Sequence, residues 1–521
     1  MRRVNLDIEM QPRHSRESGN PVKMTSSNHS SGVGAVREPP SYINAARKGG
    51  SPTAPTKTTL QDWVRMTLTS LIAFTLTACA VGPDYVQPPQ VATAASFANR
   101  DAAVFTGEQA VDKFWTQFND ATLNDLVETS LRTNHDLRVA LANFDAARAI
   151  HRLSRFDLAP TVTASAGYTD QLNARDVSPI REQKFYDGSV DAIWELDFFG
   201  GVRRNLEASR ASVQSSEASL RDAQVLVTAE VTRTYFELRG QQQQLSVAQR
   251  NVQNQGDTLK LTQARLEAGR DAELDSVRAK ALLSSTNAAI APLEAAISRS
   301  IHRLSVLTGQ EPNALVSLLQ PPQDLPALPQ FTAVGDPASL LRRRADIRVS
   351  ERDLAAATAR IGVAVADLFP HVTFTGSVGF AATSVNNLGD AGSGTRLIGP
   401  GISWAAFDLG RVRAQISAAH SQADAAVAHY EQTVLRALEE TENALVTHAR
   451  ARDRLNYLTE SAAASSRAAE LARLRYEYGV VDFLQVLDAE RTLLQAEDQL
   501  AQSRTETATS LVSVYKALAG G

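Results

Sequence analysis

Apolar and polar residues alternate along four short stretches of this 521-residue chain. On the first two stretches the apolar positions are Val162, Ala164, Ala166 and Tyr168, followed by Val190, Ala192, Trp194 and Leu196. On the other two they are Val372, Phe374, Val378 and Phe380, followed by Ile398, Ile402, Trp404 and Ala406. Alternation with a period of two predicts β-strands that have one apolar and one polar face. We expect strands at about 160–170, 186–198, 370–380 and 396–408.

A proline-free stretch from Gly201 to about Leu266 predicts one very long helix, of roughly 100 Å at 1.5 Å per residue. Apolar residues recur at every seventh position along it, at Val231, Leu238, Leu245, Val252, Leu259 and Leu266. This spacing predicts coiled-coil packing against neighbouring helices. After a turn at Ala268-Gly269 we expect a second helix from Ala272 to Leu307, with a later counterpart from Val481 to Leu518.

The chain contains two copies of one unit, 210 residues apart. Asp157-Leu158-Ala159-Pro160 recurs as Asp367-Leu368-Phe369-Pro370, and Gly200-Gly201-Val202-Arg203 recurs as Gly410-Arg411-Val412-Arg413. Each copy reads as a helix, two strands, a very long helix, a turn and a second long helix. The offset between the two copies stays constant over this whole span. The lengths of the helices and strands must therefore be fixed by contacts that extend beyond local packing. We expect repeat 1 at 119–308, a linker at 309–338 and repeat 2 at 339–521.

The single cysteine, Cys79, follows an uncharged run that is too short to span a bilayer and fits a signal-peptide core. Leu76-Thr77-Ala78-Cys79 resembles a bacterial lipobox, in which the cysteine receives a diacylglycerol and, after cleavage, an N-acyl chain. We expect a leader at 1–62 that is over-extended or disordered, a lipoprotein signal peptide at 63–78 and a lipidated segment at 79–118. The alternative is an incidental or buried cysteine. Ala80, in place of an aspartate, favours the outer membrane.

A sheet of four strands with one apolar face can occur in two environments. The sheet can be half-buried against helices, or it can be part of a membrane barrel whose apolar face meets lipid. The expected lipid anchor and the long helical stretches between the strand pairs favour the barrel. Four strands cannot close a barrel, and each unpaired backbone group in hydrocarbon costs several kcal/mol. Neighbouring chains would have to close it, and a trimer would supply twelve strands.

Charge and motifs exclude several classes of function. The chain has 53 basic and 57 acidic residues and no basic tract in either repeat, which disfavours a nucleic acid partner. Its nine histidines are scattered, and no HExxH, P-loop, GxGxxG or nucleophile-elbow motif occurs. We therefore expect no enzyme activity, no catalytic residues and no metal. We also expect no cofactor, apart from the covalent diacylglycerol and N-acyl chain on Cys79.

These residues together resemble the outer-membrane efflux protein family of TolC-like channels. Within that family they resemble the lipoprotein outer-membrane factors of tripartite RND efflux systems, of the NodT type. The similarity covers nearly everything after the cysteine and is carried by Cys79 to Tyr85, Asn134 to Arg138, and Leu341 to Gly379. Ala345 departs from the family, which usually has proline there, and a changed helix start is the expected consequence.

The resemblance implies a mainly α-helical fold with a small β part. It implies a homotrimer with a 12-stranded β-barrel in the outer membrane of a Gram-negative bacterium and an α-helical tunnel in the periplasm. It further implies a passive export duct for drugs or other small molecules, opened by docking with a periplasmic adaptor (membrane fusion protein) and an inner-membrane RND-type pump. A type I protein-secretion conduit is an alternative with the same architecture. A lipid-anchored coiled-coil scaffold without a pore is another, and the amphipathic strands argue against it.

The resemblance also identifies a candidate periplasmic gate. In the family, the turns between long helices form the periplasmic tip, where Leu-Xaa-Xaa-Leu-Asp-Ala motifs line a constriction. The matching segment here is Gly479 to Ala489, so Leu484 and Asp488 are the candidates for the constriction. The alternative for Asp488 is an ordinary solvated carboxylate on a helix surface.

Three more residues belong to this candidate gate. Tyr476 and Asp275 occupy positions at which some members of the family have a restraining hydrogen bond between helices. Gln485 replaces a charged residue found in certain relatives, which predicts a thinner network around the gate. For Tyr476 the alternative is a role in core packing.

Overall fold

The computed structural model describes residues 80–88, 94–109, 111–174, 176, 182–270 and 272–518. All of them belong to the compact unit Thr69–Gly521, one of two units into which the chain divides. The expected leader at 1–62, the expected signal peptide at 63–78 and the expected lipidation site Cys79 lie outside the described residues.

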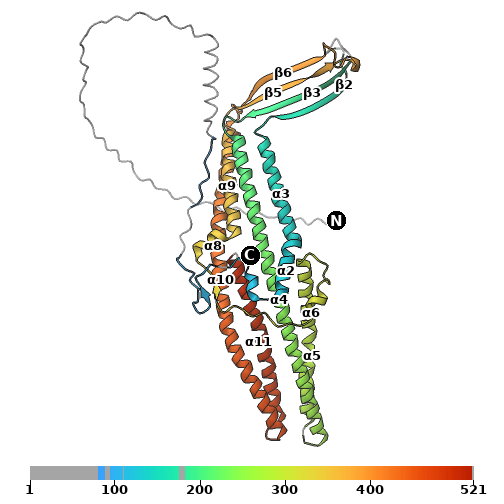
Figure 1. The fold of residues 1–521 in the computed structure, drawn as a ribbon, viewed down its shortest axis with the longest axis vertical. Coiled ribbons are helices and arrows are strands. Elements are labelled where there is room, and N and C mark those ends of the chain that lie inside the picture. Colours follow the sequence, from blue (N-terminus) through green and yellow to red (C-terminus); the bar gives the residue numbers. More distant parts are fainter. Residues whose placement is uncertain are drawn as a thin grey trace, which may run out of the picture. The chain divides into compact units, whose positions relative to one another are not determined.

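Both repeats contain the same series of long elements (Figure 1). Repeat 1 comprises α2 (Ala121–Thr133), α3 (His135–Phe156), β2 (Thr161–Leu172), β3 (Glu182–Leu196), α4 (Gly201–Glu267), α5 (Glu273–Ala288) and α6 (Ile290–Leu307). Repeat 2 comprises α8 (Pro337–Arg343), α9 (Ala345–Ala366), β5 (His371–Ala382), η2 (Val385–Asn387), β6 (Gly394–Ser403), α10 (Leu409–Glu477) and α11 (Phe483–Ala517). Shorter elements are β1 (Phe105–Thr106), η1 (Phe114–Phe118), α7 (Val316–Leu319) and β4 (Thr332–Ala333).

The second helix of repeat 1 is interrupted. The expectation of one helix from Ala272 to Leu307 is wrong, because the structure divides this stretch into α5 and α6 at Ala289. Pro292 lies in the first turn of α6, where its missing N–H does no harm. In an unbroken helix the proline ring would clash with the carbonyl of Ala288. The counterpart of Pro292 in repeat 2 is Gln502, and α11 continues through that position.

The strands follow the alternating stretches, with shifted ends. β6 ends at Ser403 rather than at 408. Residues 404–408 instead form the turn into α10, in which the Asp408 amide donates to the Ala405 carbonyl at 2.9 Å. β3 begins at Glu182, ahead of the expected 186, and pairs with β2 as far as Leu172.

The four long strands form one antiparallel sheet in the order β2-β3-β5-β6. Thr161 pairs with Ile193 in the first hairpin, and His371 pairs with Ser403 in the second. The two hairpins therefore have the same register once the 210-residue offset is applied. β3 and β5 join the repeats, while β2 and β6 each keep one edge without a strand partner in the described part of the chain.

The sheet stands beyond the ends of the helices, and its apolar face is uncovered (Figure 1). Large apolar side chains at the even-numbered positions are exposed: Val162, Tyr168, Val190, Trp194, Phe374, Val378, Phe380, Ile398 and Ile402. A sheet half-buried against helices of the same chain is therefore not what forms. An exposed apolar face of this extent indicates an interaction surface.

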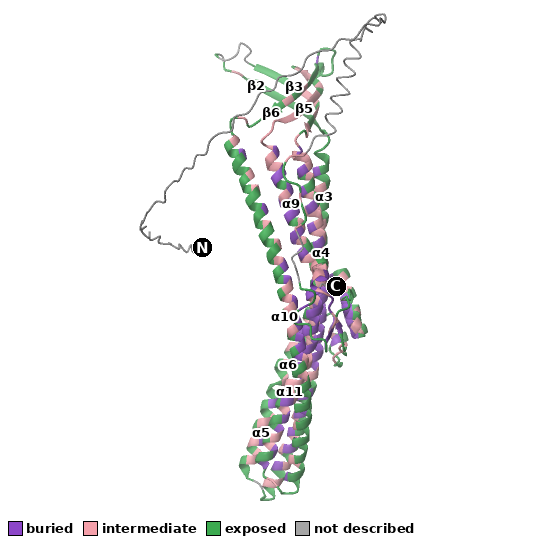
Figure 2. Cartoon of the chain, turned by 90° about the vertical axis from the view of Figure 1, so that its left-hand side faces the viewer, coloured by how far each residue is buried: buried purple, intermediate pink, exposed green. Residues whose placement is uncertain are grey.

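Burial is concentrated in the middle of the helical body (Figure 2). Phe114, Trp115 and Phe118 of η1 belong to this core. The Phe114 ring stacks on Tyr515 of α11 with centroids 4.8 Å apart, and Phe118 meets Phe236 of α4 edge to face at 4.8 Å. In addition, β1 and β4 pair in parallel. The segment before repeat 1 and the linker between the repeats therefore contribute together to two buried clusters, Phe118 and Leu319 to one and Phe105 and Val334 to the other.

The end of α4 that leads to the α4–α5 turn, from Asn251 on, packs through polar residues. The buried positions there are Asn251, Gln255, Thr258 and Thr262, whereas the expected coiled-coil positions Leu245, Val252, Leu259 and Leu266 are only partly buried. Their spacing of three and four places the polar residues on one helix face. The Asn251 amide group donates to Glu497 of α11 at 2.8 Å. A polar seam therefore joins the two long hairpins.

Candidate functional site at the helical tip

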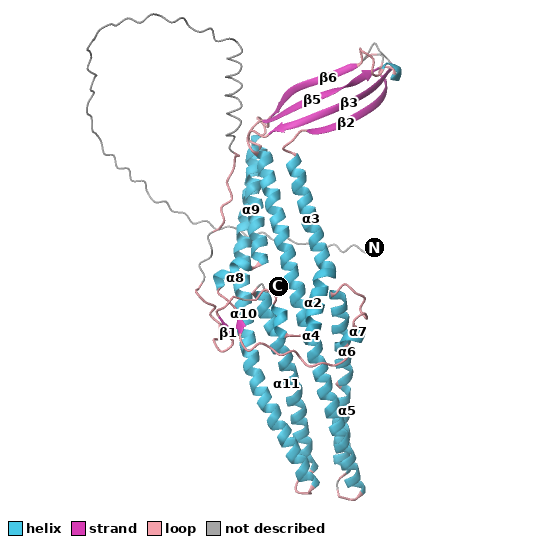
Figure 3. Ribbon diagram, viewed as in Figure 1, coloured by secondary structure: helices cyan, strands magenta, loops and turns pink. Residues whose placement is uncertain are grey.

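The α4–α5 and α10–α11 turns lie at the end of the helical body opposite the sheet (Figure 3). Gly269 and Gly479 end the two long helices in the left-handed conformation, with φ of 69° and 73°. The amide after each glycine donates to the carbonyl five residues back, that of Arg265 or Arg475, at 2.9 and 2.8 Å. This is the Schellman arrangement, which favours glycine at the left-handed position. The two tips are therefore built alike.

Tyr476 lies in the core of the tip. Its side chain is 2% exposed and packs with Ala279, Phe483 and Val486. The Arg265 guanidinium lies 4.4 Å from the centre of the Tyr476 ring, and its Nη1 donates to the Tyr476 carbonyl at 3.2 Å. Tyr476 thus holds α10 against α4, α5 and α11. This burial agrees with the core alternative, and a gate role for Tyr476 stays a prediction.

Leu484, Gln485 and Asp488 lie on the first two turns of α11, and all three are exposed on the single chain. Leu484 is 53% exposed. Asp482 caps the helix by accepting a hydrogen bond from the Gln485 amide at 3.3 Å, so the three side chains stand on the end of a capped helix. Within the described residues, the Asp488 carboxylate forms no ion pair or hydrogen bond, which leaves it available to a neighbouring copy or a partner.

Asp275 lies in the first turn of α5, in the other hairpin. It is partly buried, and its carboxylate lies 4.0 Å from Nη1 of Arg278 on the same helix. Across the 210-residue repeat, Gln485 corresponds to Asp275, and Asp488 corresponds to Arg278. The ion pair of repeat 1 therefore has no counterpart in repeat 2, and the two tips differ in charge while sharing a backbone.

A buried ion pair above the tip was missed from the sequence. Glu490 of α11 is 4% exposed, accepts from Nε of Arg473 at 2.8 Å and accepts from the Thr258 hydroxyl at 2.7 Å. This network joins α10, α11 and α4. The signal in the sequence was a base and an acid on opposite sides of the connection between α10 and α11, but repeat 1 has no such pair. The counterparts of Arg473 and Glu490 are Gln263 and Lys280, which cannot form the same pair.

Exposed apolar side chains gather around both turns. They are Leu274 and Val277 on α5, Leu471 and Leu474 on α10, Tyr478 and Val480 in the α10–α11 turn, and Leu484 on α11. Exposed apolar residues in such a group, rather than scattered singly, indicate a contact surface for another protein.

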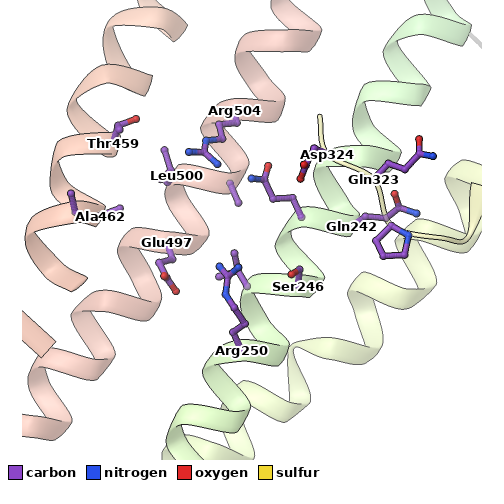
Figure 4. A pocket seen from close by; sticks show the side chains of 15 residues that line it. Gln242, Ser246, Arg250, Gln323, Asp324, Thr459, Ala462, Glu497, Leu500 and Arg504 are labelled. Carbon is purple, nitrogen blue, oxygen red and sulfur yellow. The ribbon is translucent and has the colours of Figure 1, made fainter. Parts of the chain in front are cut away.

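A cavity of about 560 Å³ lies between α4, α10, α11 and the linker (Figure 4). Arg250 and Arg504 line it together with Asp324 and Glu497, so it has no preference for one sign of charge. In the part of the chain that the structure describes, no group of three or more His, Cys, Asp or Glu could hold a metal ion.

Among the described residues, no helix combines the length and the apolar character needed to cross a membrane.

Residues 126–310 and 337–520 match the family model of the outer membrane efflux protein. The two matched stretches correspond to the two copies of the repeated unit and together cover most of the chain. The chain therefore belongs to the outer membrane efflux protein family, a family of channel proteins.

Individual relatives agree with this assignment. Nodulation protein T of Rhizobium leguminosarum bv. trifolii is 31% identical over 458 residues, which cover 87% of this chain and 97% of that protein. The toluene efflux pump outer membrane protein TtgC of Pseudomonas putida is 31% identical and covers 87% of this chain and 94% of its own length. Among solved structures, the outer-membrane channel OprN is 44% identical with a TM-score of 0.79, covering 85% of this chain and 99% of that one. The family inferred from the sequence is confirmed.

Proposed function

We propose that three copies of this chain close a 12-stranded β-barrel, and that the assembly is the passive outer-membrane duct of a tripartite efflux pump for small molecules. One structural observation on the sheet supports this proposal most directly. The four-stranded sheet has two open edges and an exposed apolar face, and it stands at one end of a long helical body.

The open edges of β2 and β6 require a partner if the sheet meets lipid. Backbone groups without hydrogen bonds are too costly in hydrocarbon, so the edge of one copy must pair with the edge of the next. The even-numbered apolar positions would then face lipid and the odd-numbered polar positions would line the lumen. On the polar face the Ser165 and Ser189 hydroxyls lie 2.9 Å apart, and Ser189 donates to Asp191 at 2.8 Å. Such a network suits a water-filled lumen.

The helices of the same copies would continue the barrel as a periplasmic tunnel that narrows at the tip. Leu484 and Asp488 are placed on the capped end of α11, where three copies would meet near the axis. Three Leu484 side chains would narrow the pore there, and a ring of three Asp488 carboxylates would repel anions that approach it. Docking energy can then open this constriction. Gln485, Asp275 and Tyr476 would set how firmly the tip is closed.

A periplasmic adaptor would dock on the exposed apolar residues of the tip, and an RND-type inner-membrane pump would supply the energy. The name of the TtgC relative, a toluene efflux pump protein, supports a small apolar substrate class. Acylation of Cys79 by diacylglycerol and an N-acyl chain would anchor each copy, since several acyl chains anchor stably where a single one does not.

A type I protein-secretion conduit is the second candidate, because the same architecture serves it. Co-expression with different inner-membrane partners distinguishes the two functions. Drug resistance restored together with an RND-type pump supports efflux. Secretion of a protein restored together with an ABC exporter supports the alternative. A scaffold without a pore predicts no conductance at all.

A matched pair of substitutions on β3 tests the channel. Val190 lies on the apolar face between Ala164 and Val378, and its neighbour Ser189 lies on the polar face. Arginine on the lipid face costs roughly 2–4 kcal/mol near the bilayer midplane. V190R should abolish membrane insertion and single-channel current in planar bilayers, whereas S189R should insert and only change the conductance. Equal tolerance of both substitutions, or no current from the unsubstituted protein, would contradict the proposal.

A further inference from the structure

A second cavity, of about 540 Å³, lies where α5 and α6 meet beside α4, and α11 closes its other side (Figure 1). Its walls are mainly apolar, formed by Val247 and Ala248 of α4, Leu282 of α5, Pro292 and Leu293 of α6, and Leu494 of α11. A cavity of this size, with apolar walls and a few polar groups, is typical of sites that bind a small molecule.

The break between α5 and α6 forms one wall of this cavity. Ala289, at which the two helices divide, lines the cavity together with Pro292. The internal repeat does not reproduce this arrangement, because α11 continues unbroken through the position that corresponds to Pro292. The counterparts of Leu282 and Asp498 are Thr492 and Ala288. The lining of the cavity therefore belongs to one copy of the repeated unit only.

Asp498 of α11 brings a carboxylate to these apolar walls. The residue is partly buried, and its carboxylate accepts a hydrogen bond from the side-chain amide of Gln502 at 2.8 Å. It forms no ion pair within the described residues. Burial raises the pKa of this carboxyl, and the bond from Gln502 opposes the rise. A partly desolvated carboxylate without a cation beside it favours the binding of one.

The charges that line the cavity give it two different ends. Arg491 is the only other charged residue among those that line it, and α4, α5 and α6 contribute none. Arg491 and Asp498 are seven residues apart on α11, which is two turns or about 10 Å, with Arg491 nearer to the tip. A cation is therefore attracted to the Asp498 end and repelled from the Arg491 end.

The cavity lies on the helix face that carries the proposed constriction. Six residues follow one another along α11 at intervals of four and three: Leu484, Asp488, Arg491, Gln495, Asp498 and Gln502. This spacing places them on a single face of the helix, and the last four of them line the cavity. Asp498 lies ten residues beyond Asp488, or about 15 Å farther from the tip. With Leu484 and Asp488 at the constriction, the cavity opens to the lumen just above it.

We propose that this cavity is a binding site for apolar amines in the wall of the duct. The ammonium group pairs with Asp498, and the apolar body packs between Leu282 and Leu494. The position of the site in the lumen rests on the proposed function, whereas the binding itself needs the residues of one chain only. Such a site holds a passing cation beside the constriction and gives the duct a preference for apolar cations over neutral molecules of the same size.

Titration of the purified full-length channel with monodansylcadaverine tests the site. This probe is an apolar amine whose fluorescence rises in apolar surroundings. N-pentyl dansylamide, which lacks the ammonium group, is the neutral comparison, and micelles without protein give the background. D498N keeps the shape of the side chain and should bind the amine roughly tenfold more weakly than the parent, with unchanged affinity for the neutral probe. E460Q, at an exposed acid of α10, is the control and should bind both probes like the parent.

A second variant and a second readout separate the site from the duct. L282W fills the cavity with a larger side chain and should weaken the binding of both probes. In planar bilayers the amine should lower the single-channel current of the parent at concentrations that leave the current of D498N unchanged.

Each result decides a different part of the proposal. A parent that binds no amine, or D498N with the affinity of the parent, would overturn the site. Binding of the amine without any effect on the current would overturn its position in the lumen. No current from the parent in the absence of probe would instead overturn the proposed duct, and the fluorescence titration would still decide whether the site binds amines.

Discussion

The indole Nε1 of Trp404 donates a hydrogen bond to the carbonyl oxygen of Leu368 at 2.9 Å. Trp194 makes the same bond to Leu158 at 3.1 Å, 210 residues earlier. Each bond ties the end of a hairpin to the turn between the preceding helix and that hairpin. Both halves of the sheet are therefore attached to the helical body in the same way.

Replacing either tryptophan with phenylalanine removes the donor and keeps most of the ring. We expect W194F and W404F each to lose about 1 kcal/mol, the usual net contribution of one hydrogen bond. The midpoint temperature of the heat-dependent gel shift of the assembled channel measures this loss. A large loss in one variant and none in the other would show that the two hairpins are not equivalent.

The gate assignment predicts that L484A and D488A raise ionic leakage through the resting channel in planar bilayers. The reason is that truncation removes both the apolar contact and the charge at the proposed constriction. E460A is the control, since Glu460 is an exposed acid in the body of α10, away from the turn. Resting conductance equal to that of E460A in both variants would remove Leu484 and Asp488 from the gate.

The buried Glu490–Arg473 pair should contribute more to the free energy of unfolding than the exposed ion pairs do. E490A leaves Arg473 without its partner and removes the acceptor of Thr258, so we expect a loss of roughly 1.5–3 kcal/mol in the free energy of unfolding. The exposed pair of Arg467 and Glu470 gives the comparison, and E470A should cost less than about 1 kcal/mol. Thermal unfolding of the two purified variants measures the difference, and equal losses would contradict a structural role for the buried pair.

Because His448 is buried, we expect the stability of the folded chain to depend on pH. His448 is bonded to Ser510, with Nδ1 2.9 Å from the hydroxyl oxygen, and burial, aided by the charge of Arg452, lowers its pKa to about 4. The unfolded chain takes up this proton at higher pH than the folded one. The stabilisation by neutral His448 is therefore complete above about 6.5 and is lost as the pH falls toward 4, by up to about 3 kcal/mol.

H448Q should flatten the fall in thermal stability between pH 6.5 and 4. H429Q, at an exposed histidine of the same helix, should leave the fall unchanged. The same slope in H448Q as in the parent would show that other groups set the acid sensitivity.

The spacing of apolar residues predicted the helices and strands correctly where the local sequence determines them. The strands follow the alternation around Val162 and Phe374, and α4 is unbroken because nothing in it interrupts the helix. The break at Ala289 escaped prediction because the apolar pattern continues past Pro292, although the ring of that proline forbids a continuous helix.

Contacts between distant parts of the chain were beyond sequence reasoning. Arg204 holds residues about 120 positions earlier, and Glu351 holds Tyr85 across 266. No rule of residue spacing links such distant positions. The internal repeat does not help, because each of these contacts occurs in only one of its two copies. Tyr476 shows the same limit, since its burial under Arg265 depends on how two hairpins meet.

The proposed duct requires three chains to close one barrel. Native mass spectrometry of the acylated protein, released intact from detergent, counts the chains in the assembled channel directly. We expect three copies per particle, with twelve strands between them. A particle of one chain, or of any number other than three, would contradict it.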